Sequence, residues 1–471
     1  MEQELTLDAD TPVIDTPDAA TAPADNFFAR SARGMADSYS KAAEAGADLS
    51  RLRVDSVGPK GAWVRHLTSP GFPLHTATTI RNAHGELSHA DGVFVLCGCA
   101  YLSASFWPET IAAAHRAIDS HGVGSYDSAP LSGETLHHEH VKEELLKLYR
   151  PNGGGAAFLT ISASMANITA VPMLVGRGDT IFADAESHMT LMQGFTASQA
   201  RVLRFKHGDM QELERKLIEF DRNDPQRVRR RLLVSDGIFS MSGHVCNLPK
   251  LVELARRYQC RLLIDEAHAL GALGPSGRGT ADHWNMDPAC IDVITGTLAK
   301  AVGAQGGYII CNASLAAEAS YEYTTNRVFS SGVPASIAAA ATEVLRQMNA
   351  ATPASIASST GNTFSSMYHK QRRNMEILRG YLRQLQELGI ETEPDFAPGA
   401  VQRIVVGNEQ ALFEIQKRLY QHGVYVLGLV YPVVPQGRDQ IRLTVMPVIS
   451  EAEMHQCGKA IVEVCRSVLH G

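Results

Sequence analysis

Short apolar runs alternate with segments of helical periodicity between Gly92 and Cys311. The apolar runs occupy residues 156–162, 180–184, 201–205, 231–236, 260–265, 291–296 and 308–312. Runs without polar alternation are typical of strands that are buried on both faces, and helical segments between such strands favour parallel connections. The sequence therefore predicts an α/β fold in which helices cover both faces of a mainly parallel sheet.

A chain of 471 residues is longer than one ordinary domain, so we expect further domains or segments outside this sheet. Residues 1–25 are acidic and too polar to bury a core, so we interpret them as a disordered tail, and residues 26–90 as an N-terminal arm. We expect the large domain to span 91–345. The pattern of 346–471 is a long helix followed by strand, helix, two strands and a helix, which predicts a small C-terminal α+β domain.

Charge and composition argue against several classes of protein. The net charge is −7 and only the cluster 227–231 is strongly basic, so we expect no nucleic-acid partner. That cluster is either a solvated segment that precedes a buried strand or a binding site for an anion. We find no apolar run of about 18 residues, no secretory signal, and no metal-binding or disulfide-scaffold spacing among the eight cysteines. We therefore expect a cytoplasmic protein with reduced thiols, no integral membrane segment and no metal site.

A single lysine, Lys300, follows the apolar run 291–296 in a turn of small residues. Small neighbours leave room for a flat cofactor, and burial lowers the pKa of an amine, so such a lysine is suited to form a Schiff base. A lysine at the end of a strand can also extend to solvent without any role in binding. The other motifs decide between these two interpretations.

Two of these motifs also follow apolar runs. Asp265 ends the run 260–265, and His268 comes three residues later, at the edge of a parallel sheet where ligands bind. A buried carboxylate there needs a cation such as the protonated pyridine nitrogen of pyridoxal phosphate, and His268 can donate to the phenolic oxygen of the same ring. His188 follows the run 180–184 and can lie flat on such a ring. Each of these residues, taken singly, can also cap a helix or lie at the surface.

A turn of small residues, Ser162, Ala163 and Ser164, follows the first run and opens a helical segment. Backbone N–H groups at a helix start bind anions, and Thr297, three residues before Lys300, can add a hydroxyl. The same turn can be a plain helix cap. Because all four motifs follow strands of one sheet and suit one cofactor, we interpret them together as a pyridoxal phosphate site with Lys300 as its Schiff-base residue.

Two long segments, 236–279 and 296–308, resemble the α-oxoamine synthases, a family that includes serine palmitoyltransferase, aminolevulinate synthase and the oxononanoate synthase of the biotin pathway. Matches at 122–149, 182–195, 327–336 and 431–447 extend the resemblance from about residue 90 to the C-terminus. It implies a pyridoxal phosphate enzyme of fold type I, similar to class II aminotransferases. Such an acyltransferase condenses an amino acid with an acyl-CoA, releases carbon dioxide and gives an α-aminoketone, here a 3-ketosphinganine-type product or similar.

The resemblance assigns a role to each candidate residue. Catalytic roles fall to Lys300, which forms the Schiff base, Asp265 at the pyridine nitrogen and His268 at the phenolic oxygen. His188 would stack on the ring, and Thr297, Ser162, Ala163 and Ser164 would hold the phosphate. The family shares its sites between two subunits, so the resemblance implies a homodimer in which Ser330 and Ser331 reach the partner's phosphate. Arg442 matches the arginine that binds the carboxylate of the amino acid.

The sequence departs from the family where the amino acid would be recognised. Cys99 stands at a position of asparagine or tyrosine, and residues 127–129 lack the family's arginine. We therefore place Cys99 beside the amino acid and leave the identity of that substrate and the acyl chain length open. The alternatives are an α-aminoketone autoinducer-type synthase with another amino acid, an aminotransferase or decarboxylase that uses no acyl-CoA, and a non-catalytic subunit.

Overall fold

The computed structural model describes residues 94–470 except 225–227, 320–323, 394, 396 and 432, together with two short paired strands, β1 (Ile80–Arg81) and β2 (Leu87–Ser88). The tail expected at 1–25 and nearly all of the arm expected at 26–90 lie outside the described residues. Residues 76–430 and 434–471 form one compact unit.

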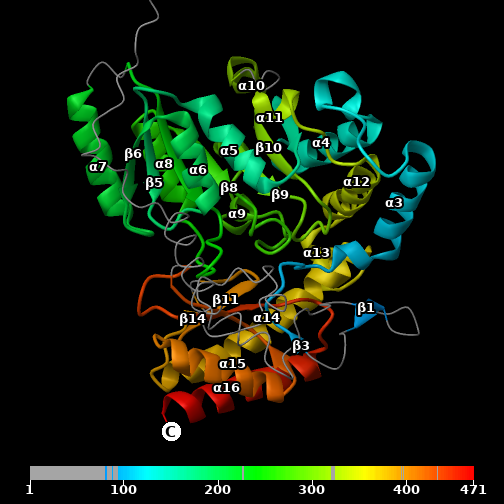
Figure 1. Cartoon of the computed structure of the whole chain (residues 1–471), viewed down its shortest axis with the longest axis vertical. Helices are drawn as coiled ribbons and strands as arrows, with labels where there is room; N and C mark the ends of the chain where they lie inside the picture. Colours follow the sequence, from blue (N-terminus) through cyan, green and yellow to red (C-terminus); the bar gives the residue numbers. More distant parts are fainter. Residues whose placement is uncertain are drawn as a thin grey trace, which may run out of the picture. The chain divides into compact units, whose positions relative to one another are not determined.

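A seven-stranded sheet lies at the centre of the first part of this unit (Figure 1). Its strands, in spatial order, are β4 (Gly155–Thr160), β10 (Gly307–Asn312), β9 (Val293–Thr297), β8 (Arg261–Asp265), β7 (Arg231–Asp236), β5 (Thr180–Asp184) and β6 (Arg201–Phe205). Strand β10 is antiparallel to β4 and β9, and the other neighbours are parallel. This arrangement confirms the predicted α/β fold with a mainly parallel sheet.

Alternate residues of the central strands enter two different hydrophobic cores. Leu232 and Val234 of β7 pack with helices α5 (Ala163–Leu174) and α6 (Met189–Ser198), whereas Leu233 belongs to the core on the other face. Helices of that second face are α4 (Leu136–Tyr149), α7 (Met210–Asn223), α8 (Leu248–Arg257) and α12 (Ala335–Ala350). Because successive side chains of a strand point to opposite faces, a strand that is apolar throughout is buried on both sides.

Local sequence explains where these helices begin and which side they bury. Helix α7, for example, starts where the Asp209 carboxylate accepts the N–H of Glu212, and buries Leu213, Leu217 and Phe220 along one stripe. The remaining helices near the large sheet are α3 (Pro108–His121), α9 (Thr280–His283), α10 (Ala313–Ala319) and α11 (Thr325–Val328).

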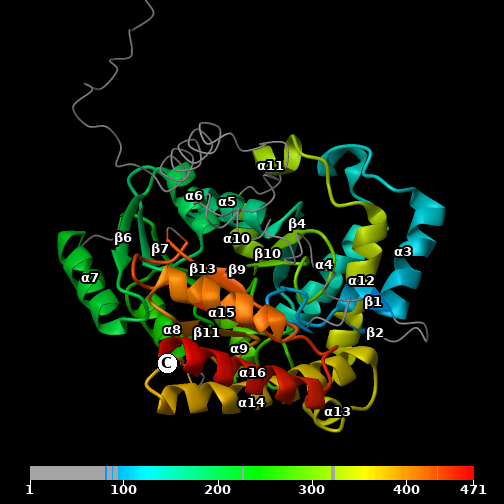
Figure 2. The same cartoon turned by 60° about the horizontal axis from the view of Figure 1, so that its bottom comes forward.

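The C-terminal residues form a second sheet with a hydrophobic core of its own (Figure 2). The antiparallel strands β11 (Val401–Val405), β14 (Gln440–Thr444) and β13 (Leu427–Leu429) lie in that order, and α14 (Thr363–Glu387), α15 (Glu409–Gln421) and α16 (Glu451–Leu469) contribute apolar side chains to the same core. The short helix α13 (Pro353–Ala357) precedes α14. Strand β3 (Phe94–Val95) pairs in parallel with β12 (Val424–Tyr425), and Leu96 enters this C-terminal core.

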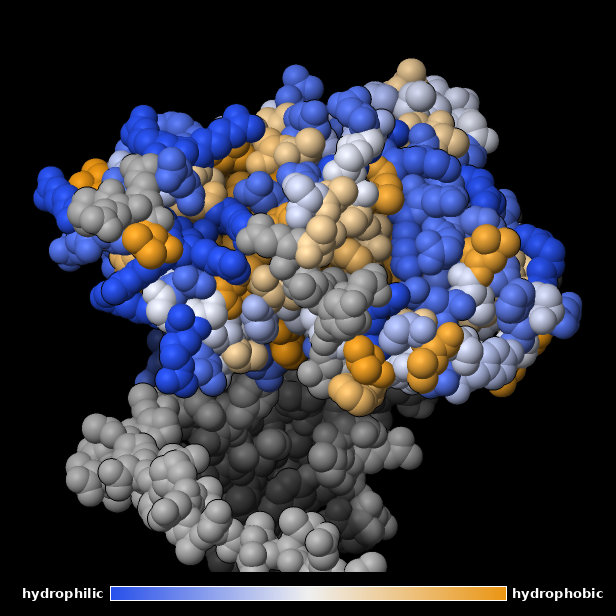
Figure 3. Space-filling view, turned by 90° about the horizontal axis from the view of Figure 1, so that it is seen from above, coloured by the Kyte–Doolittle hydropathy of each residue, from blue (hydrophilic) through white to orange (hydrophobic). Residues whose placement is uncertain are grey.

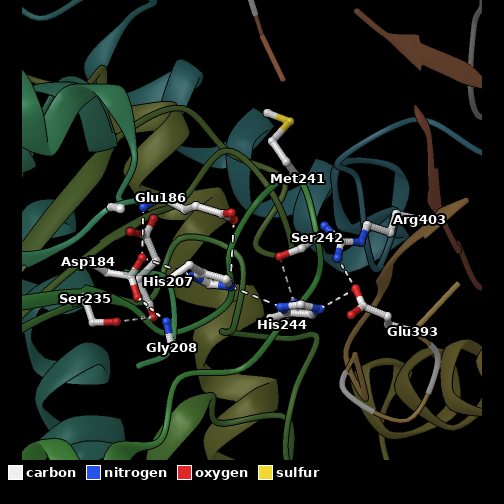
Figure 4. Close-up of polar contacts among 12 residues, drawn as sticks. Asp184, Glu186, His207, Gly208, Ser235, Met241, Ser242, His244, Glu393 and Arg403 are labelled. Carbon is white, nitrogen blue, oxygen red and sulfur yellow. Dashed lines mark hydrogen bonds and ion pairs between the residues drawn. The ribbon is translucent and has the colours of Figure 1, made fainter. Parts of the chain in front are cut away.

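A line of polar side chains connects the two sheets (Figure 4). His207 lies 3.0 Å from Asp184 at the end of β5 and 3.1 Å from His244, which in turn lies 2.9 Å from Glu393. Glu393 pairs with Arg403 on β11. Burial lowers the pKa of His207, but its hydrogen bond to Asp184 acts in the opposite direction and the pKa is raised overall, whereas burial lowers the pKa of His244. Hydrogen bonds between ionisable groups therefore join the loop after β7 to the C-terminal strands.

Hydrophobic residues are scattered among hydrophilic ones on the face shown in Figure 3. The exposed large apolar side chains include Val123, Tyr126, Leu131 and Phe329. The segments that carry them lie next to each other, because Ser128 and Ser331 form a β-bridge. Within the described ranges, each helix is too short or too polar to cross a membrane, and no three His, Cys, Asp or Glu side chains are grouped to hold a metal ion.

Candidate active site

The connections that follow five strands of the large sheet meet around one cavity of about 250 Å³. Strands β4, β5, β7, β8 and β9 deliver its lining residues, which are Ser162, Ala163, Ser164, Asn167, His188, Thr190, Asp236, Ile238, Asp265, Ala267, His268, Thr297 and Lys300. Four separate sequence motifs thus come together at the carboxyl edge of the parallel strands, where ligands bind in open α/β sheets. Eight residues predicted from sequence line this cavity.

Asp265 is buried and both of its carboxylate oxygens accept hydrogen bonds. Oδ2 accepts from Nδ2 of Asn167 at 2.7 Å, and Oδ1 accepts from the backbone N–H of Ala267 at 2.9 Å. Nδ2 of Asn167 also donates to Thr190 at 2.9 Å, while its Oδ1 is buried without a partner among the described residues. The carboxylate is therefore held in a fixed orientation at the cavity wall.

Lys300 and His268 contact each other across the cavity. Nζ of Lys300 lies 2.8 Å from Nε2 of His268, and the hydroxyl of Tyr101 lies 2.6 Å from Nδ1 of the same ring. Burial lowers the pKa of Lys300. The pKa of His268 is well below its ordinary value because the ring is buried and because the positive charges of Lys300 and Arg442 disfavour its protonation. A lysine amine with a lowered pKa is a better nucleophile and base at neutral pH.

His188 stands at the start of α6, where its backbone N–H donates to Oδ2 of Asp236 at 3.1 Å. Nδ1 of His188 lies 2.8 Å from Oγ1 of Thr190. Burial lowers the pKa of His188, whereas burial together with the nearby charge of Asp265 raises the pKa of Asp236 well above its ordinary value. The site thus combines an imidazole whose pKa is lowered, a carboxyl group whose pKa is raised, and the hydrogen-bonded side chain of Asp265.

The turn after β4 closes one end of the cavity. Oγ of Ser162 accepts the N–H of Met165 and caps α5, so the strand predicted at 156–162 ends two residues earlier. Gly307 allows this turn to approach β10 closely, since a Cβ at residue 307 would lie 2.4 Å from the backbone carbon of Ser162. Thr297 accepts the N–H of Ala299 at 3.1 Å and lies at the same cavity. First-turn N–H groups of a helix and two hydroxyls suit an anion.

Arg442 and Cys99 lie outside the lining of this cavity but contact each other. Nη2 of Arg442 is 3.7 Å from Sγ of Cys99, and its Nε donates to the carbonyl of Ser240 at 2.6 Å. Ser240 belongs to the loop after β7, two residues beyond Ile238 in the cavity wall. The arginine is almost fully buried, and its charge is strong enough there to lower the pKa of His268.

Ser330 and Ser331 do not reach the cavity within one chain. They line a separate, smaller cavity together with Glu134, His138 and Arg327. Arg327 forms an ion pair with Glu134 at 3.0 Å.

Sequence reasoning missed four polar residues of the site or its wall, namely Asn167, Thr190, Asp236 and Tyr101, and two apolar lining residues, Ile238 and Ala267. Asn167 follows Ser164 by three positions, which places both on one side of a helix, and Asp236 ends an apolar run as Asp265 does. Those two positions carried a signal that would have identified them. Tyr101 has no such signal, because its contact with His268 spans 167 residues of sequence.

Residues 93–461 match the family described as aminotransferase class I and II. An 8-amino-7-oxononanoate synthase of Geobacter sulfurreducens is 33% identical over 395 residues, which cover 82% of this chain and 93% of the relative. The enzyme of the same name from Thermoanaerobacter pseudethanolicus is 31% identical over 394 residues, with 82% and 92% covered.

Solved structures share the fold. A serine palmitoyltransferase of Sphingomonas wittichii superposes with a TM-score of 0.73 at 22% identity, covering 94% of this chain and 99% of the other. An 8-amino-7-oxononanoate synthase of Francisella tularensis gives a TM-score of 0.62 at 21% identity, with 80% and 99% covered. The large and the C-terminal sheet described above are therefore those of a fold type I architecture.

Proposed function

Because the chain belongs to the pyridoxal phosphate-dependent α-oxoamine synthases within the aminotransferase class I and II family, we propose that it condenses an α-amino acid with an acyl thioester, with loss of carbon dioxide, to give an α-aminoketone. The observation that carries this proposal is the 2.8 Å contact between Nζ of Lys300 and Nε2 of His268 in the cavity that Asp265 borders. This contact supports the proposal because a buried amine, an imidazole and a carboxylate line the same cavity.

The residues around the cavity fit the cofactor. Lys300 offers an amine whose pKa is lowered, and Asp265 offers a buried carboxylate that accepts hydrogen bonds from neutral donors. Among the described residues, Oδ1 of Asn167 is buried without a partner. Lys300 would bind the cofactor covalently, Asp265 would bond its ring nitrogen, His268 its phenolic oxygen, and His188 would lie on the ring. Ser162, Ala163, Ser164 and Thr297 would hold its phosphate. When bound, pyridoxal phosphate supplies an electron sink for a carbanion at the α-carbon of the substrate.

Three side chains of the protein have separate roles in the proposed reaction. Lys300, once released by the incoming amino acid, removes the proton from the α-carbon and later returns one to the product. Asp265, whose two oxygens accept hydrogen bonds, would present its carboxylate to the ring nitrogen and so favour the protonated form of that nitrogen. His268, held neutral by burial, donates a hydrogen bond where negative charge develops.

Arg442 is the proposed partner of the amino acid's carboxylate. Its Nε is occupied by the carbonyl of Ser240, and its nearly complete burial strengthens a charge-assisted bond. Cys99, 3.7 Å from the guanidinium, would then lie beside the amino acid. A substrate held here would extend its α-carbon toward the cavity of Lys300.

The acyl donor is proposed to be an acyl-CoA, with an acyl carrier protein thioester as the second donor to test. The product named for the sequence relatives, 8-amino-7-oxononanoate, corresponds to alanine joined to a seven-carbon acyl group that ends in a carboxylate. A 3-ketosphinganine-type product, which the resemblance implies, corresponds to serine joined to a long saturated acyl group. These two pairs define the extremes of a substrate panel.

A homodimer is proposed to complete the site. The exposed Val123, Tyr126, Leu131 and Phe329 lie on two segments that the Ser128–Ser331 bridge holds together, and exposed apolar groups of this kind favour a protein interface. A second copy of the chain on this surface would bring Ser330 and Ser331 to a partner's phosphate. Sedimentation of the purified protein measures the oligomeric state directly.

The test of the proposed function is an assay of the purified, cofactor-loaded protein. Glycine, alanine and serine carrying ¹³C in the carboxyl group are each combined with seven-carbon dicarboxylic and long-chain acyl-CoA, and thiol release, labelled carbon dioxide and product mass are measured. We expect thiol and labelled carbon dioxide in equal amounts with at least one pair, and none with the Lys300→Ala variant. Formation of a keto acid or amine without thiol release would instead indicate an aminotransferase or decarboxylase.

A further inference from the structure

Tyr101 contacts His268 through the ring nitrogen opposite to the one that faces Lys300. Its hydroxyl is 2.6 Å from Nδ1, and Nε2 is 2.8 Å from Nζ of Lys300. Tyr101 is 0% exposed and His268 is 6% exposed. Nε2 of Gln371 donates to the carbonyl of Tyr101 at 2.8 Å and holds that part of the backbone. Tyr101 does not line the cavity, so it reaches the reacting centre through the imidazole.

The charges around the hydroxyl determine which group donates. Burial raises the pKa of Tyr101, so the hydroxyl keeps its hydrogen. Cys99 also raises that pKa, whereas the nearby charge of Arg442 lowers it. Because a guanidinium has only donors, it cannot accept the hydroxyl hydrogen, whereas Nδ1 of His268, 2.6 Å from the hydroxyl, can accept it. The pKa of His268 is held well below its ordinary value, so the ring carries a single hydrogen. With Nδ1 accepting, that hydrogen is on Nε2.

We propose that Tyr101 is a positioning residue that fixes His268 as the tautomer with its hydrogen on Nε2, so that the ring presents a donor to the cavity. The inference rests on the proposed function only for the identity of the oxygen that this donor meets during the reaction. A donor on Nε2 also affects Lys300, because only a neutral amine has a lone pair to accept it. Tyr101 therefore favours the neutral, reactive form of Lys300 indirectly, through the imidazole of His268.

Replacing Tyr101 by phenylalanine removes this constraint. Nδ1 then has no donor, and the ring can take the other tautomer, in which Nε2 accepts a hydrogen bond from a protonated Lys300. We expect the pKa of the Lys300 amine to rise, so that it becomes reactive only at higher pH. One hydrogen bond of ordinary strength corresponds to a shift of about one pH unit.

Tyr149 provides a matched control. Its hydroxyl is 2.9 Å from that of Tyr308, both tyrosines are buried, and neither lines the cavity. Tyr149→Phe removes the same atom from a similarly buried environment. It does not touch His268.

The first measurement needs no variant at the tyrosine. Nitrogen NMR of the holoenzyme labelled with ¹⁵N-histidine reports which ring nitrogen carries the hydrogen, and His268→Gln identifies the signals of His268. We expect the hydrogen on Nε2 in the wild type. A hydrogen on Nδ1 would overturn the proposal, whether or not the enzyme makes an α-aminoketone. The absence of product from an enzyme with the expected tautomer would contradict the proposed function alone.

The second measurement follows Schiff-base formation by absorbance when pyridoxal phosphate is added to cofactor-depleted protein between pH 6 and 10. We expect the midpoint of the rate profile to move up by about one unit in Tyr101→Phe, which lowers the rate at neutral pH roughly tenfold, and to stay unchanged in Tyr149→Phe. An unchanged midpoint in Tyr101→Phe, or equal shifts in both variants, would contradict the inference. If Tyr101→Phe does not fold, the tautomer measured in the wild type decides.

Discussion

Asn167 donates a 2.7 Å hydrogen bond to Oδ2 of Asp265, and this bond joins helix α5 to the end of strand β8. The two residues are 98 positions apart in sequence, and both are almost fully buried. Asp265 thus receives its orientation from one helix and its backbone position from a central strand. A neutral amide leaves the negative charge of the carboxylate available to a ligand, whereas an arginine at that place would neutralise it.

We predict that Asn167→Ala weakens cofactor binding. The carboxylate of Asp265 loses one of two donors, and a hydrogen bond to a charged group contributes about 1.5–3 kcal/mol, so the Kd for pyridoxal phosphate should rise roughly ten- to a hundredfold. Absorbance titration of cofactor-depleted protein measures this value. Asn374→Ala is the control, because Asn374 is equally buried but bonds the carbonyls of Met446 and Ile449 in the C-terminal core. An equal loss of affinity in both variants would assign the effect to stability.

Lys300→Ala should abolish product formation and the visible absorbance of the Schiff base while the far-ultraviolet circular dichroism stays that of the wild type. Only the amine and its stem are removed, and the turn that carries it keeps its backbone hydrogen bonds. Product formed at the wild-type rate would refute the assignment of the site.

Asp265→Asn should retain the cofactor but slow exchange of the substrate's α-proton with deuterated water by orders of magnitude. The amide cannot keep the ring nitrogen protonated, so the electron sink is weaker. Proton NMR of an amino acid in D₂O reports this exchange without any acyl donor. Asp292→Asn serves as control, since Asp292 accepts the N–H of Leu262 on the opposite end of β8 and should leave the exchange rate unchanged.

Substitutions at Cys99 and Arg442 should separate recognition of the side chain from recognition of the carboxylate. We expect Cys99→Asn to change the ranking of glycine, alanine and serine as substrates with little effect on the cofactor spectrum, because an amide adds donors beside the amino acid. Arg442→Ala should weaken all three alike, by about 1.5–3 kcal/mol in kcat/KM, because all present the same carboxylate. If Cys99→Asn leaves the ranking intact and alters cofactor affinity, the placement of Cys99 is wrong.

The line of polar groups between the sheets should make part of the stability depend on pH. The pKa of His207 is raised above its ordinary 6.5, so its stabilising contribution is fully present below pH 6.5 and is lost as the pH rises through the folded-state value. We expect the urea midpoint of the wild type to exceed that of His207→Gln by a margin that shrinks between pH 6 and 9. The exposed His422 provides the control variant His422→Gln. A margin that grows with pH would contradict the assigned charge state.

Local patterns predicted the large sheet and eight lining residues of the cavity. Strands that are buried on both faces appear in the sequence as continuous apolar runs, and the lining residues lie at or just after the ends of these runs. Asp265, His188 and Lys300 each follow an apolar run, and the strand order brings those run ends to one edge. Tyr101 was not predicted because its role depends on a partner 167 residues away. Asn167 was missed although its spacing from Ser164 carried a helical signal, and its partner Asp265 lies 98 residues away. The antiparallel direction of β10 was not predicted either, since an apolar run carries no information on strand direction. The expected domain boundaries and the roles of Ser330 and Ser331 remain predictions.

The antiparallel direction of β10 has a consequence for the lysine itself. Lys300 lies in the short connection between β9 and β10, and this connection is closed by hydrogen bonds from Leu298 to Gly306 and from Ala304 to Leu298. Both ends of the connection are therefore anchored in two adjacent inner strands of the sheet. Only rotation about the side-chain bonds can carry the amine toward a ligand or away from it, and such rotations are far faster than loop movements. If Lys300 acts as proposed, an amine released by the incoming amino acid would therefore remain within one side-chain length of the place to which it must return.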